Sequence, residues 1–182
     1  MGAKHQFIEL ELPPGYTGAV KEAIALEIID TIVRRTKKGV DKDGDSFPGY
    51  SKEYVESIDF KSAGKSKGDV NLTLSGDLLD ELALLSISGR KLKIGYERGS
   101  EANAKADGNI RGTYGQSSPI RGKARDFLGL TDDELEKILS KYPRDDREAA
   151  LGRASKTIAA KEVSERTARG IETDLNDLED DF

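Results

Sequence analysis

Three aspartates at alternate positions have the spacing in this sequence that most resembles a metal site. The stretch DKDGDSFPGYSKEY places Asp41, Asp43 and Asp45 at the first, third and fifth positions of a loop, where a calcium-binding EF-hand carries oxygen ligands. An EF-hand also requires a glycine at the sixth position and a bidentate glutamate at the twelfth. Ser46 and Lys52 stand there instead. Two interpretations follow: a calcium-binding loop that departs from the pattern, and a solvated turn.

The sequence offers little material for enzymatic chemistry. It contains no cysteine, which excludes disulfides, thiolate metal sites and cysteine nucleophiles. His5 is its one histidine, so a Ser/His/Asp triad or a histidine-rich metal site is not expected. Asp77, Asp80 and Glu81 would share one helical face, but exposed carboxylates are usually just solvated. We therefore expect no catalytic residue and no cofactor.

Composition predicts one domain with an appendage. The 182 residues are 36% hydrophobic and 35% charged, as in a chain that lies partly outside a packed core. No apolar run approaches the ~18 residues that span a bilayer, so no membrane contact is expected. Charges interrupt the N-terminal segment, so no signal peptide is expected either. We expect a core domain at residues 1–142 and a charged, partly helical or disordered extension at 143–182.

The charge balance argues against a dedicated nucleic-acid-binding protein. A formal net charge of −5 provides no overall basic surface to neutralise phosphates. Basic residues do cluster locally in RRTKK and KSAGKSKG. The first cluster lies in the last turn of a predicted helix, where cations interact favourably with the helix dipole, and phosphate contact is the alternative interpretation.

Periodicity predicts an α+β fold. QFIELEL alternates as a half-buried strand, and residues 20–33 repeat apolar side chains every fourth position as a long helix. LLSIS and KLKIGYE flank Gly89-Arg90 as the arms of a β-hairpin. Thr131 and Glu134 form a capping box before a short helix. The prediction is a small antiparallel sheet of three to four strands, packed with a long N-terminal helix and a short C-terminal helix.

Several segments carry weaker patterns. Val70, Leu72 and Leu74 alternate as a strand would, and Ser51 is suited to cap a short helix that ends near Ile58. Residues 97–124 are rich in glycine, alanine, serine and charge, which predicts a long loop.

The C-terminal stretch IETDLNDLEDDF contains six acidic groups and no basic one. Ile171, Leu175, Leu178 and Phe182 recur through it at helical spacing. It has two interpretations: a solvated tail, and a partner-binding helix that folds on docking.

The order of several segments resembles a family of phage proteins. VRRTKKGVDKDGDSFPGYSKEY, VNLTLSGDLLDEL, KLKIGY, KADGN and ARDFLGLT occur in an order similar to the virion-morphogenesis and tail-completion proteins of tailed bacteriophages. The resemblance spans residues from about Val20 to Tyr142. The matching positions are structural rather than catalytic: Asp43, Gly44, Phe47, Tyr50, Ser51, Tyr54, Leu74, Ser75, Gly76, Leu78, Arg125, Phe127, Leu128 and Gly129.

The resemblance implies a non-enzymatic structural protein of a phage particle. Such a protein forms a homo-oligomeric ring, expected to be a hexamer, at the head–tail joint, as a neck, tail-completion or terminator protein. Its partners would be portal or adaptor proteins and tail proteins. It would lie in the virion, and in the host cytoplasm before assembly. A ring needs heterologous contacts that close, and a sheet edge and loops that order on assembly would supply them.

Two groups of residues become candidates on this basis. The interface candidates are Phe47, Tyr50, Tyr54, Arg125, Phe127, Leu175, Leu178 and Phe182. The candidates for transient contact with DNA in a ring lumen are Arg34, Arg35, Lys61, Lys65 and Lys67.

The resemblance also bears on the aspartate loop. The loop becomes a turn that carries Phe47 and two tyrosines, with aspartate side chains bonded to neighbouring amides. The alternative function is a calcium-binding or other small interaction module that uses Asp41, Asp43 and Asp45.

Overall fold

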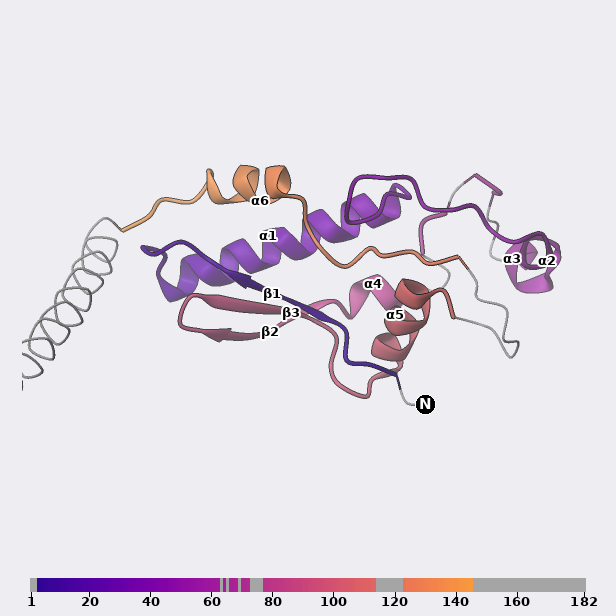
Figure 1. Ribbon diagram of the computed structural model, residues 1–182, viewed down its shortest axis with the longest axis horizontal. Coiled ribbons are helices and arrows are strands. Elements are labelled where there is room, and N and C mark those ends of the chain that lie inside the picture. Colours follow the sequence, from indigo (N-terminus) through magenta and orange to yellow (C-terminus); the bar gives the residue numbers. More distant parts are fainter. Residues whose placement is uncertain are drawn as a thin grey trace, which may run out of the picture. The chain divides into compact units, whose positions relative to one another are not determined.

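The structure is a computed structural model that describes residues 3–62, 64, 66–68, 70–72, 77–113 and 123–145 (Figure 1). The chain divides into two compact units. The larger contains Met1–Leu12 and Gly18–Pro143, and the smaller contains Pro13–Thr17 and the chain from Arg144 onward. All helices and strands described below belong to the larger unit. The boundary predicted after residue 142 stays a prediction.

Three strands form one antiparallel sheet in the described part of the chain, which confirms the predicted α+β class. They are β1 (Phe7–Glu11), β2 (Ala83–Ser88) and β3 (Lys91–Gly95), in the order β1-β3-β2. The predicted hairpin between β2 and β3 is confirmed. Gly89 has a φ of +57°, a left-handed conformation that glycine adopts without a steric penalty at a tight turn.

The strand register places apolar side chains on one face of the sheet. Ile8 pairs with Ile94 and Leu10 pairs with Leu92, and both β3 residues are 0% exposed. The register of β2 against β3 shifts between Leu84 and Ser86, which leaves one extra residue in β2. The sheet therefore has a continuous apolar face that another layer must cover.

The long helix α1 (Gly18–Lys37) supplies that layer, packing against β2 and β3 (Figure 1). Its buried stripe contains Ile24, Ile28 and Ile32, as the periodicity predicts. The helix ends before Gly39, whose φ is +79°. In the described ranges, no helix is both long and apolar enough to cross a membrane.

The helix α6 (Asp132–Leu139) packs against α1 and begins with the predicted capping box. The Thr131 hydroxyl accepts a hydrogen bond from the Glu134 amide at 3.2 Å, and the Glu134 carboxylate accepts one from the Thr131 amide at 3.0 Å. These reciprocal bonds satisfy two amides that a helix start leaves without partners.

In the described part of the chain between α1 and the hairpin, three short helices form. They are α2 (Lys52–Glu56), α3 (Ile58–Ser62) and α4 (Asp77–Asp80). The prediction that Ser51 caps the first of them is confirmed, because its hydroxyl accepts a hydrogen bond from the Tyr54 amide at 3.2 Å. The main element contact of α2 and α3 is with each other.

The prediction of an unbroken loop over residues 97–124 is wrong. Helix α5 (Glu101–Arg111) occupies part of it, between an N-cap at Ser100 and a left-handed C-cap at Gly112. Its buried face carries polar side chains, which hydrophobic periodicity cannot detect. Asn103 accepts a hydrogen bond from the Gln6 amide, and Asp107 accepts one from the Gln6 side chain, both at 2.8 Å. These bonds hold the segment before β1 against α5.

The prediction of a strand that begins at Val70 is also wrong for the residues that the structure describes. Val70 is buried, but neither Val70 nor Leu72 lies in a strand. Leu72 has a φ of +53°, a left-handed conformation that is incompatible with an extended strand. Leu74, which completes the predicted alternation, lies outside the described residues.

Acid is expected to weaken the contact between α1 and the residues that follow α6. The Lys141 ammonium and the Tyr142 hydroxyl both donate to the Glu27 carboxylate on α1. The Lys141 bond is the largest cause that lowers the pKa of Glu27. A carboxyl group whose pKa is lowered by folding stabilises the fold at neutral pH, and that stabilisation is lost as the pH falls through the lowered pKa.

Because Lys141 is 59% exposed, this contribution to the free energy of unfolding is at most about 1 kcal/mol. Urea denaturation at neutral and acidic pH measures it. The native chain should lose more stability on acidification than a Glu27→Gln variant. Equal losses would contradict the assignment.

Candidate functional site

The aspartate loop is a turn closed by its own side chain. The Asp41 carboxylate accepts hydrogen bonds from the Asp43 amide at 3.0 Å and the Asp45 amide at 2.8 Å. The Asp41 amide in turn donates to the Asp45 carbonyl at 2.8 Å. These bonds match the predicted role of a turn former for Asp41; for the side chains of Asp43 and Asp45 that role stays a prediction.

The geometry does not support the calcium interpretation. Among the described residues, no group of three or more histidine, cysteine, aspartate or glutamate side chains is placed to hold a metal ion. The Lys42 ammonium lies 3.7 Å from carboxylate oxygens of both Asp43 and Asp126, so a protein cation already neighbours these carboxylates. The alternative function, a calcium-binding or other small interaction module at Asp41, Asp43 and Asp45, stays a prediction.

Arg35 is buried and links α1 to the start of α6. Its assignment as a DNA contact is therefore corrected. Arg35 leaves the last turn of α1 and is 8% exposed. Its guanidinium donates to the Glu134 carboxylate at 2.6 Å, and to the carbonyls of Phe127 at 2.9 Å and Gly129 at 2.8 Å. A guanidinium that is buried and bonded in this way is not available to a phosphate. Its role is to tie α1 to the start of α6.

Two predicted interface aromatics are buried in the fold. Phe127 is 0% exposed, and its ring lies 6.5 Å from that of Tyr96. Phe47 is buried as well, and its amide donates to the Gly39 carbonyl at 2.7 Å. The interface assignment of both residues is corrected, because burial within the chain leaves their rings without a surface for a partner.

The other described interface candidates gather into one aromatic cluster. The rings of Tyr50, Tyr54 and Phe60 lie 5.2 to 5.4 Å apart between centroids. Phe60 is buried, and both tyrosines are half-buried. Such tilted and edge-on contacts favour aromatic packing beyond the burial of area alone. The cluster thus gives α2 and α3 a small apolar centre of their own.

Arg125 joins this cluster to the segment before α6. Its guanidinium carbon lies 5.4 Å from the centroid of the Tyr50 ring, and its Nη2 donates to the Pro48 carbonyl at 3.3 Å. Burial lowers the pKa of Arg125. Tyrosine and arginine in a partly desolvated setting are the residue types that dominate binding energy at protein interfaces. The structure brings Arg125 to Tyr50, which is distant in sequence and whose ring contacts that of Tyr54.

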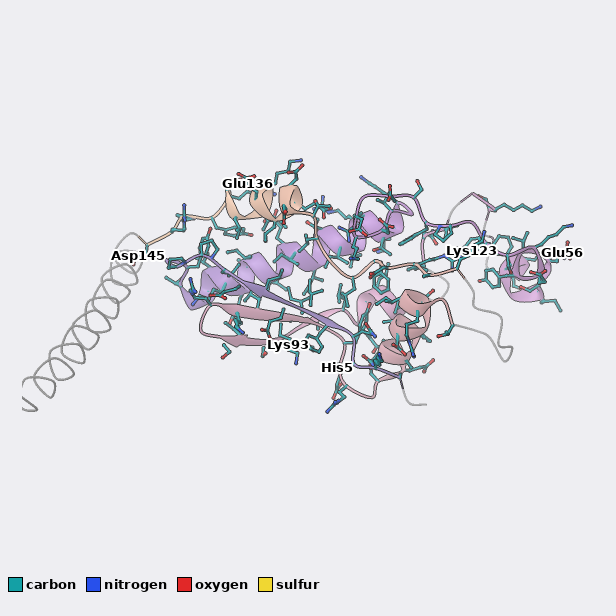
Figure 2. All side chains as sticks on the ribbon, in the orientation of Figure 1. His5, Glu56, Lys93, Lys123, Glu136 and Asp145 are labelled. Carbon is teal, nitrogen blue, oxygen red and sulfur yellow. The ribbon has the colours of Figure 1, made fainter. Side chains whose placement is uncertain are left out.

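Residues 51–62, here named the α2–α3 lobe, also expose a large apolar side chain. Ile58 is 81% exposed (Figure 2, where Glu56 marks this region). Leu26 on α1 is 63% exposed. Sequence analysis did not identify Ile58 or Leu26 as an exposed residue. It also missed Phe60, which only the fold brings into contact with both tyrosines.

The remaining predicted contacts have simpler surroundings. Arg34 is exposed and pairs with Asp30 at 2.8 Å, one helical turn away. Lys61 and Lys67 are exposed, so their contact with DNA stays a prediction. Lys65, Leu175, Leu178 and Phe182 lie outside the described residues.

Comparisons of the chain with protein-family models, with curated proteins and with solved structures found no match.

Proposed function

We propose that this protein is a non-enzymatic structural component of a phage particle and assembles into a ring at the head–tail joint. The order of sequence motifs that resembles tail-completion proteins supports the phage assignment. The partners on this proposal are further copies of the chain, a portal or adaptor protein and tail proteins. On this proposal the protein is made in the host cytoplasm and then acts in the virion.

The observation that carries the proposal is the presence of exposed, large apolar side chains on separate elements. Ile58 belongs to the α2–α3 lobe and Leu26 to α1, and both are mostly exposed. A closed ring requires two different contact surfaces on each subunit, one for each neighbour. The ring proposal therefore requires two such surfaces on each subunit.

The surroundings of the buried polar and charged residues are consistent with an assembly role. Arg35, Asp107 and Asn103 are buried and hydrogen-bonded to other parts of the chain. His5, a potential general base, bonds the Tyr96 carbonyl at 2.8 Å through its Nε2. These groups fix chain segments in place.

The test is the mass of the purified full chain in solution, measured by light scattering over a range of concentrations. The measurement is made alone and after mixing with the portal and tail proteins of the same phage. Negative-stain microscopy then examines any assembly. We expect a closed oligomer with one subunit number and a ring outline, with the same mass in calcium and in chelator.

Two results would contradict the proposal. One is a chain that stays monomeric at every concentration and with every partner protein. The other is an assembly that grows without limit into filaments, because that would show contacts that do not close.

A further inference from the structure

The hydrogen-bond ladder between β1 and β3 changes partners at its end. Gln6 lies opposite Tyr96, one pair beyond β1, and the Tyr96 amide donates to the Gln6 carbonyl at 3.1 Å. Two residues that form one such bond in an antiparallel ladder normally exchange both. The Gln6 amide instead donates to the Asn103 side chain on α5 at 2.8 Å. The Tyr96 carbonyl accepts from Nε2 of His5, also at 2.8 Å (Figure 2).

The Asn103 carboxamide binds the segment before β1 as a peptide group of a neighbouring strand would. Its oxygen accepts from the Gln6 amide, and its nitrogen donates to the Lys4 carbonyl at 3.0 Å. The Asp107 carboxylate, one turn further along α5, accepts from the Gln6 side chain at 2.8 Å. These three bonds, here named the Asn103 clasp, join α5 to the residues before β1 (Figure 1).

Little apolar surface holds α5 in addition to the clasp. Its buried residues are all small or polar: Ala102, Asn103, Ala106, Asp107, Gly108 and Asn109. Ile110, the one large apolar residue in the sequence of α5, is half-buried. Burial stabilises in proportion to the apolar area that leaves water, so these side chains contribute less than the isoleucines of α1. The clasp therefore carries a large share of the attachment of α5.

We propose that α5 is a detachable element, and that the end of the β1–β3 ladder closes when α5 leaves. The Tyr96 carbonyl has two lone pairs, so it can accept from the Gln6 amide while it keeps its bond to His5. The Gln6 amide thus has a partner in both states, Asn103 when α5 is attached and Tyr96 when it is detached. The amide that the clasp releases does not lose its bonding, which keeps the cost of opening low.

Opening of α5 would also release the chain at Arg125. The Arg125 amide donates to the carbonyl of Asn109, in the last turn of α5, at 2.8 Å. The guanidinium of the same residue lies over the Tyr50 ring. Detachment removes the main-chain bond that holds Arg125 beside this ring. The clasp before β1 therefore controls how firmly Arg125 is held against the aromatic cluster, and this device requires no second copy of the chain.

Native-state hydrogen exchange of the unmodified full chain, resolved to single amides at low urea concentrations, tests the device. Amides that open together share one free energy of opening. The amides of α5 and Arg125 should open as one group, at lower urea than the β1 amides that bond β3. The Gln6 amide should exchange with the β1 group, because it is bonded in both states. Exchange of Gln6 with the α5 group would overturn the proposal, as would opening of α5 only together with β1.

An Asn103→Ala variant of the full chain gives a second measurement. It removes two of the three bonds of the clasp, so the α5 amides should exchange at least about tenfold faster than in the native chain. The Gln6 amide should change by less than about threefold, because the Tyr96 carbonyl replaces the lost acceptor. Acceleration of Gln6 by the same factor as α5 would show that the ladder does not close.

Asn109→Ala is the matched control. It removes the same carboxamide from α5, but that group donates to the Lys105 carbonyl within the helix. The α5 amides should therefore change by less than about threefold. Equal acceleration of α5 in the two variants would overturn the role of the clasp, since it would show that α5 responds to any lost carboxamide.

Discussion

Replacement of Arg35 by alanine is expected to lower the free energy of unfolding by about 3 kcal/mol. The guanidinium satisfies the Glu134 carboxylate and two backbone carbonyls, those of Phe127 and Gly129. Its removal leaves these acceptors in a region closed to most of the solvent. Glu134 keeps its bond to the Thr131 amide and is 24% exposed on its side chain, which places the loss at the low end of the range for buried ion pairs.

Urea denaturation of the full chain at one fixed concentration measures this loss. Lysine at position 35 should recover only part of it, because an ammonium cannot reach three acceptors with the fixed fork of a guanidinium. The matched control is Arg34→Ala. Arg34 pairs with Asp30 in an exposed setting, so its loss should cost less than about 0.5 kcal/mol. Equal effects of the two substitutions would show that the buried hydrogen bonds of Arg35 do not stabilise the contact between α1 and the start of α6.

Replacement of Gly95 by alanine is expected to disrupt the pairing of β1 with β3. A methyl group there would lie 2.4 Å from the Gln6 carbonyl oxygen, and 2.6 Å from both Cα and Cβ of Phe7. Two of these three atoms belong to the backbone and cannot rotate away. The strand β1 must therefore move off β3, at an expected cost of about 3 kcal/mol or more.

Thermal unfolding followed by circular dichroism measures this cost, and hydrogen exchange of the β1 amides locates it. Gly49→Ala is the matched control, because no atom lies within 4 Å of its added carbon. That substitution should change stability by less than about 0.5 kcal/mol. An unchanged unfolding midpoint for the Gly95 variant would show that β1 does not approach β3 as closely as described.

Local patterns made most of the fold predictable. The alternation in β1 and the period of α1 follow from one buried face each, and the hairpin follows from Gly89 at the turn. The start of α6 follows from two side chains that bond each other's backbone. In each case the residues that specify the element are neighbours in sequence.

The elements that were missed depend on partners distant in sequence. Helix α5 buries Asn103 and Asp107 because the segment before β1 supplies their hydrogen-bonding groups. The composition of α5 does not indicate these partners, although Ser100 and Gly112 are recognisable as its caps. The broken strand after Val70 depends on a left-handed Leu72, which sequence patterns do not predict for a leucine.

The candidate site was predictable only in part, for the same reason. Sequence proximity and aromatic character group Phe47, Tyr50 and Tyr54, but they cannot separate a ring that fills the core from one at the surface. Long-range packing decides this: Phe127 meets Tyr96 inside, whereas Arg125 lies over Tyr50 near the α2–α3 lobe. A resemblance that rests on aromatic positions therefore cannot distinguish residues of the core from residues at the surface.

The irregular register of β2 has a consequence for how copies of this chain can meet without aggregating. An outermost strand with an uninterrupted row of amides and carbonyls is a template on which strands of other molecules can stack into fibrils. The extra residue between Leu84 and Ser86 breaks that row and increases the local twist. Copies of the chain that meet in a crowded solution are thereby discouraged from joining through their backbones, so a contact between two copies has to be made by side chains.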